Sequence, residues 1–198
     1  MTGASGAVVD LVFGLRGSSV MPDYADGLWS ALLAHLPWLG EVEELGVHPL
    51  AGMSPGGAEL YLSRHSRLIL RLPRGRCDAA LALQGACLDI GGTVEVAAAT
   101  VRPLQPATVV HAGMVALDEE DEARFLARCR ESLAAIGISG DLLCGKRRQS
   151  GGRVGYSVMV RDVSPDDSLR LQWSGIGTGR RQGCGIFVPH KSTDPVSA

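Results

Sequence analysis

The sequence predicts an α+β fold in which one order of elements, βαββαβ, occurs twice along the chain. Short apolar, β-branched segments predict strands, and segments with helical spacing and clear start or stop residues lie between them. The pattern restarts after a break at Pro103 and Pro106. The chain has 198 residues, a length that suits two small domains.

The first half opens with an apolar, β-branched strand, followed by a helix that starts after Met21-Pro22-Asp23 and that Pro37 ends. A short extended segment, two strands around an arginine-bearing bend and a short helix come next. A strand pair broken by Gly91-Gly92 closes this half, which therefore has an extra strand or two beyond the simple order. The expected segments are 8–15, 21–36, 45–50, 58–63, 66–72, 77–83 and 87–97.

The second half follows the order more closely. Its first helix has acidic residues at the start, which suit the positive end of a helix dipole. Its second helix begins with a capping serine, a first-turn proline and two acids, Ser164-Pro165-Asp166-Asp167. Ser150-Gly151-Gly152 between two strands is a hairpin signal. The expected segments are 108–117, 118–136, 142–149, 153–162, 164–173 and 185–189.

Each half is therefore expected to form a ferredoxin-like (RRM-like) domain, a four-stranded sheet with helices on one face. The expected domains are 1–102 and 107–190, followed by a disordered tail at 191–198. RNA-recognition modules use this architecture, but small enzymes and regulators share it. The fold class alone therefore leaves the function open.

Composition narrows the class of protein. The chain is 45% hydrophobic and 20% charged, as packed globular domains are. Neither an apolar run of about 18 residues nor a signal peptide is present, so we expect a cytoplasmic protein without a membrane partner. The five cysteines are odd in number and lack CxxC spacing, which predicts reduced thiols. Acidic residues and histidines do not cluster at ligand spacing, so neither a metal nor a cofactor is expected.

Positive charge is locally concentrated although the formal net charge is −2. Residues 1–140 contain 10 basic and 16 acidic residues, whereas residues 141–198 contain 9 and 5. Arginine clusters suit phosphates because the guanidinium is a planar fork of donors, although solvated surfaces and a GC-rich genome also produce them. The three clusters predict a defined cationic groove, and they are Arg64 to Arg76, Lys146 to Arg153, and Arg180-Arg181.

A glycine run precedes the last expected strand, with five glycines within the eleven residues from Gly175 to Gly185. The run follows a helix and enters a strand, so it is neither a dinucleotide-binding fingerprint nor a P-loop. Glycines let the backbone N–H groups of such a loop lie against a phosphate chain. Arg180 and Arg181 would add charge there, which favours phosphate binding over a simple flexible connection.

Twin ferredoxin-like halves that end in a glycine-rich loop before the last strand resemble the repeat-associated (RAMP) proteins of CRISPR systems. Among them, the chain is similar to the Cas six endoribonucleases in their Myxan-type variant. The resemblance spans nearly the whole chain, and its most specific part runs from Gly175 to Pro189. The other matching segments are 9–13, 37–39, 46–50, 67–73, 102–104 and 167–172.

This resemblance implies a metal-independent endoribonuclease that binds CRISPR repeat RNA and cleaves precursor crRNA. The ribose 2′-OH attacks the adjacent phosphorus and leaves a 2′,3′-cyclic phosphate and a 5′-OH. Other Cas effector subunits are implied as further partners. Two alternatives stay open: a non-catalytic RNA-binding subunit of the same superfamily, and a ferredoxin-like regulator or small-molecule enzyme without an RNA role.

A histidine suits the proton transfer because its unperturbed pKa of about 6.5 lies near working pH. The resemblance favours His48, just after the first helix, over the alternative that it only packs before Pro49; His35 is the rival. Tyr24 is a second catalytic candidate or a packed aromatic. Arg64 is the candidate for stabilising the phosphorane, with Arg67 as the alternative. The residues expected to bind RNA are Arg67, Lys146, Arg147, Arg148, Arg153, Gly177, Gly179, Arg180, Arg181 and Gly183.

Overall fold

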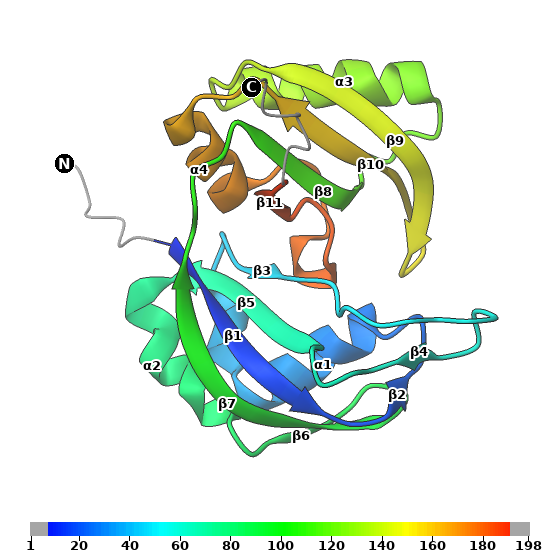
Figure 1. Ribbon diagram of the computed structural model, residues 1–198, viewed down its shortest axis with the longest axis vertical. Helices are drawn as coiled ribbons and strands as arrows, with labels where there is room; N and C mark the ends of the chain where they lie inside the picture. The colour runs from blue at the N-terminus through cyan, green and yellow to red at the C-terminus, as the bar shows by residue number, and fades with distance from the viewer. Residues whose placement is uncertain (1–7, 191–198) are drawn as a thin grey trace, which may run out of the picture. The chain divides into compact units, whose positions relative to one another are not determined.

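A computed structural model of the chain describes residues 8–190. By their contacts these residues form two compact units (Figure 1). Within the described residues, the first unit contains 8–104 together with 150–152 and 179–183. The second contains 105–149, 153–178 and 184–190. The tail expected at 191–198 lies outside the described residues.

The first unit is built on a five-stranded antiparallel sheet in the order β3-β5-β1-β7-β6. The first strand lies between the third and last strands of the βαββαβ order, which is the ferredoxin-like arrangement with one added edge strand. A separate two-stranded sheet pairs β2 with β4. The strands are β1 (Val8–Arg16), β2 (Ser19–Val20), β3 (Gly46–Val47), β4 (Leu60–Tyr61), β5 (Arg67–Pro73), β6 (Cys87–Asp89) and β7 (Thr93–Pro103).

The helices of this unit pack on one face of its sheet (Figure 1). Leu28 and Leu32 of the first helix share a core with Leu11 and Phe13 of β1. Pro37 ends this helix, as predicted, and also starts a short 3-10 helix, because proline is tolerated in a first turn. The helices are α1 (Ala25–His35), η1 (Pro37–Glu41), η2 (Arg74–Arg76), α2 (Cys77–Ala80) and η3 (Leu81–Leu83).

The opposite side of this sheet carries the polar residues of its strands. Successive side chains of a strand point to opposite faces, so Leu11 and Phe13 point toward the helices while Asp10, Val12 and Gly14 point away. We call this second side the helix-free face. It presents charged residues of three neighbouring strands, and its members in β1, β5 and β7 include Asp10, Arg16, Arg67, Arg71, Thr100 and Arg102.

The second unit has a four-stranded sheet in the order β11-β8-β10-β9. Its helices contribute Phe125, Leu133 and Leu171 to a separate core. The predicted ferredoxin-like order is confirmed in both halves. The elements are β8 (Val109–Val115), α3 (Glu122–Ala135), β9 (Asp141–Ser150), β10 (Arg153–Arg161), α4 (Pro165–Ser174) and β11 (Phe187–Pro189).

Most predicted starts and stops are observed, and the differences have physical causes. Ser164 caps α4 by accepting a hydrogen bond from Asp167 N, as predicted. β7 continues to Pro103, past the predicted end at 97, because β1 pairs with it along that length, Asp10 opposite Arg102. Among residues 8–190, no helix is long and apolar enough to cross a membrane.

Candidate functional site

A buried ion cluster lies on the helix-free face, with Asp10 at its centre. Arg71 of β5 and Arg102 of β7 stand directly opposite Asp10 in the two neighbouring strands. Arg71 donates from Nε to Oδ1 over 2.8 Å and from Nη2 to Oδ2 over 3.2 Å, the bidentate geometry of a strong ion pair. Arg102 Nη2 donates to Oδ2 over 3.0 Å. The side chains of Asp10 and Arg71 are only 5% and 1% exposed.

These contacts set the charge of Asp10. Burial alone would raise the pKa of this carboxyl, but the contacts with His48 and Arg71 outweigh it and hold the pKa well below its usual range. Asp10 is therefore an anion at neutral pH, and its charge acts on the neighbouring side chains of Arg71 and His48.

His48 joins this cluster from the position directly after β3. Its backbone N donates to Ile69 O over 2.9 Å, which extends the β3–β5 pairing by one residue. Its Nε2 lies 3.3 Å from Asp10 Oδ1, an ion-pair distance without the alignment of a hydrogen bond. Only 8% of the side chain is exposed. Burial lowers the pKa of His48, against the opposing effect of Asp10, so the imidazole is neutral at pH 7.

Tyr24 contacts the segment that carries His48. It precedes α1, and its hydroxyl accepts a hydrogen bond of 2.6 Å from Leu50 N, two residues after His48. Burial raises the pKa of this phenol, so it keeps its proton at neutral pH. His35, by contrast, is exposed at the last position of α1.

The glycine run forms a turn that belongs to the first unit between Gly179 and Gly183. These two glycines have φ values of 77° and 87° and flank a 3-10 turn that carries both arginines. A Cβ added to Gly183 would lie 3.3 Å from Pro49 N, so the turn packs closely against the residue after His48. Burial, together with the positive charge of Arg71, lowers the pKa of Arg180 to about 10. The turn therefore adds a cation close to the ion cluster.

Arg181 is occupied within the same unit. Its Nη2 donates to Gly40 O over 2.9 Å and to Val42 O over 3.2 Å, and its guanidinium lies 5.0 Å from the centre of the Trp29 ring. The side chain thereby supplies a donor to backbone carbonyl oxygens at the C-terminal end of η1. Gly177 belongs to the second unit, where Thr178 N beside it donates to Ala116 O.

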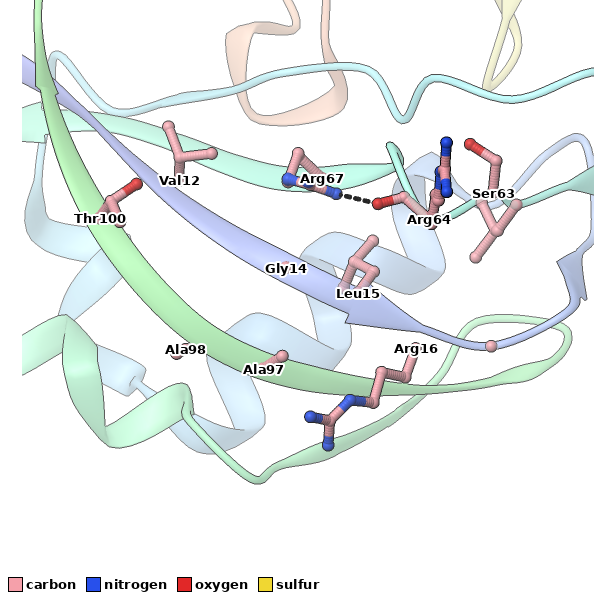
Figure 2. A pocket seen from close by; sticks show the side chains of 12 residues that line it. Val12, Gly14, Leu15, Arg16, Ser63, Arg64, Arg67, Ala97, Ala98 and Thr100 are labelled. Carbon is pink, nitrogen blue, oxygen red and sulfur yellow. Dashed lines mark hydrogen bonds between the residues drawn. The ribbon is translucent and has the colours of Figure 1, made fainter.

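An arginine-lined pocket of about 670 Å³ opens on the helix-free face (Figure 2). Arg16, Arg64 and Arg67 line it. Arg67 Nη1 donates to Arg64 O over 2.7 Å and to Ser66 O over 2.8 Å, which fixes its guanidinium. Arg64 Nε donates to His65 Nε2 over 3.1 Å. Arg64 is thus brought together with Arg67, in a pocket whose lining does not include His48.

The β9–β10 hairpin carries the basic cluster from Lys146 to Arg153, whose charged residues lie in the part of the hairpin that belongs to the second unit. Lys146, Arg147 and Arg148 are exposed along β9, and Arg153 is half-buried at the start of β10. Arg147 makes a 3.4 Å contact with Glu120, both side chains being largely exposed. The hairpin therefore presents its charge to solvent.

Comparison with known proteins identifies the family. A model of the family described as Cas6 Crispr matches residues 9–192. The chain belongs to the Cas6 family. It is 36% identical over 187 residues to the CRISPR-associated endonuclease Cas6 of Myxococcus xanthus (strain DK1622), a match that covers 91% of this chain and 81% of that protein.

Solved structures show the Cas6 fold in this chain. One, of a CRISPR-associated protein Cas6, matches with a TM-score of 0.68 at 13% identity and covers 93% of this chain and all of the other. Another is described as a RAMP protein binding different RNA substrates and has a TM-score of 0.65 at 12% identity, covering 92% of this chain and 100% of the other. At such low identity the likeness concerns the fold alone.

Three members of the ion cluster were not among the site residues expected from the sequence of this Cas6 chain: Asp10, Arg71 and Arg102. A signal for two of them was present, because Asp10 and Arg71 each interrupt an apolar strand and carry opposite charges. Among residues 8–190, no group of three or more His, Cys, Asp or Glu side chains is placed to hold a metal ion.

Proposed function

We propose that this chain is a metal-independent endoribonuclease that binds CRISPR repeat RNA and cleaves precursor crRNA, with other Cas subunits as further partners. The observation that carries the proposal is the 36% identity, over 91% of the chain, to the Myxococcus xanthus CRISPR-associated endonuclease Cas6. The three basic clusters support an RNA substrate, since phosphate contacts dominate affinity for nucleic acids.

In the proposed reaction the 2′ oxygen of one ribose attacks the adjacent phosphorus, and the bond from phosphorus to the 5′ oxygen of the next nucleotide breaks. The 2′-OH loses its proton and the leaving 5′ oxygen gains one, so the products are a 2′,3′-cyclic phosphate and a 5′-OH. Positioning the oxygen in line and moving these protons accounts for the catalysis.

His48 is the proposed proton acceptor. Its lowered pKa keeps the imidazole neutral at pH 7, the form that accepts a proton. Asp10, 3.3 Å from Nε2, stabilises the imidazolium that forms. Tyr24 is the proposed donor to the leaving oxygen, because burial keeps its phenol protonated. Arg64 is the proposed cation for the charge of the phosphorane.

The remaining proposed contacts are to the RNA backbone. The exposed charges of β9 and β10 suit the phosphates of a stem, and the glycine-rich turn suits a close approach of backbone N–H groups to phosphate. The proposed RNA-binding residues are Arg67, Lys146, Arg147, Arg148, Arg153, Gly177, Gly179, Arg180, Arg181 and Gly183.

Single-turnover cleavage of repeat RNA in EDTA tests this function. Cleavage should persist in EDTA, and a deoxyribose at the nucleotide 5′ of the cut should abolish it. His48→Ala should slow the reaction by roughly 10²–10⁴-fold, with RNA affinity retained. His35→Ala is the matched control. If His48→Ala cleaves at the wild-type rate and His35→Ala cleaves slowly, the role of proton acceptor passes to His35.

One observation favours the alternative of a non-catalytic RNA-binding subunit, namely the small exposed fraction of the His48 side chain. The same assay separates the two functions. Salt-dependent binding of repeat RNA without any cleavage by the wild-type protein would establish the binding subunit.

A further inference from the structure

The pocket on the helix-free face has the chemistry of a nucleotide site. Its rim carries three guanidinium groups, and among its twelve lining residues there is no acid. One of the three, Arg16, is paired outside the pocket lining with Glu95 at 2.9 Å, both side chains being exposed. Ser63 and Thr100 supply hydroxyl groups at the same rim (Figure 2).

Three small residues form part of the pocket floor. Gly14 of β1 lies beside Ala97 and Ala98 of β7 (Figure 2). A Cβ added to Gly14 would lie 3.3 Å from Ala97 Cβ, so the absence of a side chain leaves the surface over Ala97 open. An apolar surface bordered by guanidinium groups can stack against the face of any base. The volume of about 670 Å³ lies within the range of small-ligand sites.

Arg67 is fixed before any ligand arrives. Its Nη1 is held by the carbonyl oxygens of Arg64 and Ser66, while its Nε and Nη2 donate to no residue of the described chain. A guanidinium ordered in this way loses little side-chain entropy when it binds a phosphate, which strengthens binding.

The pocket also lies close to the row of residues that includes His48. Arg67 precedes Ile69 by two residues in β5, and Ile69 O accepts the hydrogen bond from His48 N. Two residues of a strand span about 7 Å, so Arg67 and His48 occupy neighbouring rows on one side of the sheet.

We propose that this pocket binds one unpaired nucleotide of the RNA substrate, with its base on the floor of Gly14, Ala97 and Ala98 and its phosphate on Arg67. The nucleotide is unpaired because bases within a stem are stacked and present only their edges. Holding it beside His48 sets which phosphodiester bond is cut. This inference rests on the proposed function and names the part of the substrate that determines the position of cleavage.

The test pairs a blocked pocket with RNAs that each lack one base. Ala98→Leu fills the floor without removing a charge, and Ala134→Leu, at an exposed position of α3, is the matched control. Arg67→Gln removes the fixed guanidinium, with Arg124→Gln on α3 as its control. Unfolding midpoints of the four variants exclude misfolding as a cause of weaker binding.

Wild-type protein should lose roughly tenfold in affinity when one particular unpaired nucleotide is abasic, as expected for loss of one stacked base. Ala98→Leu should bind intact RNA with a similar loss and show no further loss with that abasic RNA, and its cleavage position should spread to neighbouring bonds. Both control variants should behave as wild type.

The pocket assignment would be overturned if Ala98→Leu and Arg67→Gln bind and cleave every abasic RNA as wild type does. The proposed endoribonuclease function would still stand in that case. Wild-type protein that neither binds nor cleaves repeat RNA would overturn the proposed function, and this inference with it.

Discussion

The ion cluster of the first unit and the β9–β10 hairpin of the second use the same side chain for different purposes. Arg71 has a side chain that is 1% exposed and is held bidentately by Asp10, whereas Arg147 is 50% exposed and makes one long contact with Glu120. The buried arginine organises the protein itself. The exposed arginine is available to a ligand.

This difference shows that the position of an arginine in the fold, more than its presence in a cluster, decides its role. The sequence groups Arg67 with Arg71, and Arg180 with Arg181. In the structure Arg67 lines an open pocket, whereas Arg71 is buried. Arg181 donates hydrogen bonds to carbonyl oxygens at the end of η1.

The largest expected effect is that of Asp10→Ala. It leaves the Arg71 guanidinium buried without its carboxylate, which costs about 3–5 kcal/mol of unfolding free energy in urea. Asp141→Ala, which breaks the exposed pair with Arg161, is the matched control and should cost about 0–1 kcal/mol. Equal losses in the two variants would show that burial does not set the contribution of these ion pairs to stability. Asp10→Leu combined with Arg71→Met should cost less than Asp10→Ala alone, because no buried charge is left unpaired.

Arg181→Ala should come next. The variant loses two charged hydrogen bonds to the carbonyls of Gly40 and Val42 and the contact with Trp29, at a cost of about 1–2 kcal/mol in urea unfolding. Arg147→Ala should change stability by less than about 0.5 kcal/mol. A stability of Arg181→Ala equal to that of wild type would contradict the structural role of this side chain.

The pH dependence of stability distinguishes the histidines of the two units. The folded-state pKa of His48 is lowered by burial, so the unfolded chain binds the proton more readily and stability falls as pH drops below about 6.5. His111 is affected in the same direction by burial and by His190 and Arg148. His48→Gln should flatten the decline in urea midpoint between about pH 7.5 and 5.5 more than His111→Gln does, because His48 is more deeply buried.

The contribution of Asp10 falls in a separate window. Its folded-state pKa is also lowered, so its stabilising effect is complete above the unfolded value of about 3.9 and is lost as pH falls below it. A decline between pH 7.5 and 5.5 that His48→Gln leaves intact would assign that decline to other groups.

The smallest expected effect on stability is that of the hairpin. Lys146→Gln, Arg147→Gln and Arg148→Gln together should change unfolding free energy by less than about 0.5 kcal/mol per substitution. They should make the negative slope of log affinity for repeat RNA against log salt shallower by about 2, since three phosphate contacts are lost. As a control, replacing Arg124, Arg128 and Arg130 of α3 with Gln removes the same charge. An equal change of slope in this control would show that the hairpin has no specific role in RNA binding.

Much of the fold follows from local patterns. Pro37 ends α1, Ser164 caps α4, and the glycines at 151 and 152 turn the hairpin, all as predicted, because period, capping and turn chemistry act between residues a few positions apart. The element order of both halves follows from these signals. His48, Tyr24 and Arg64 were chosen as site residues through a family resemblance, and their catalytic roles stay predictions.

Local sequence could not reveal which charges meet. Asp10 bonds to residues 61 and 92 positions away, and those pairs exist only because β5 and β7 flank β1 in a particular register. The packing of 179–183 within the first unit is equally distant in sequence. Residue type and short-range pattern thus determine the elements and their ends, whereas strand register and burial decide whether an arginine stabilises the protein or faces its ligand, since only the folded sheet brings opposite charges out of water together.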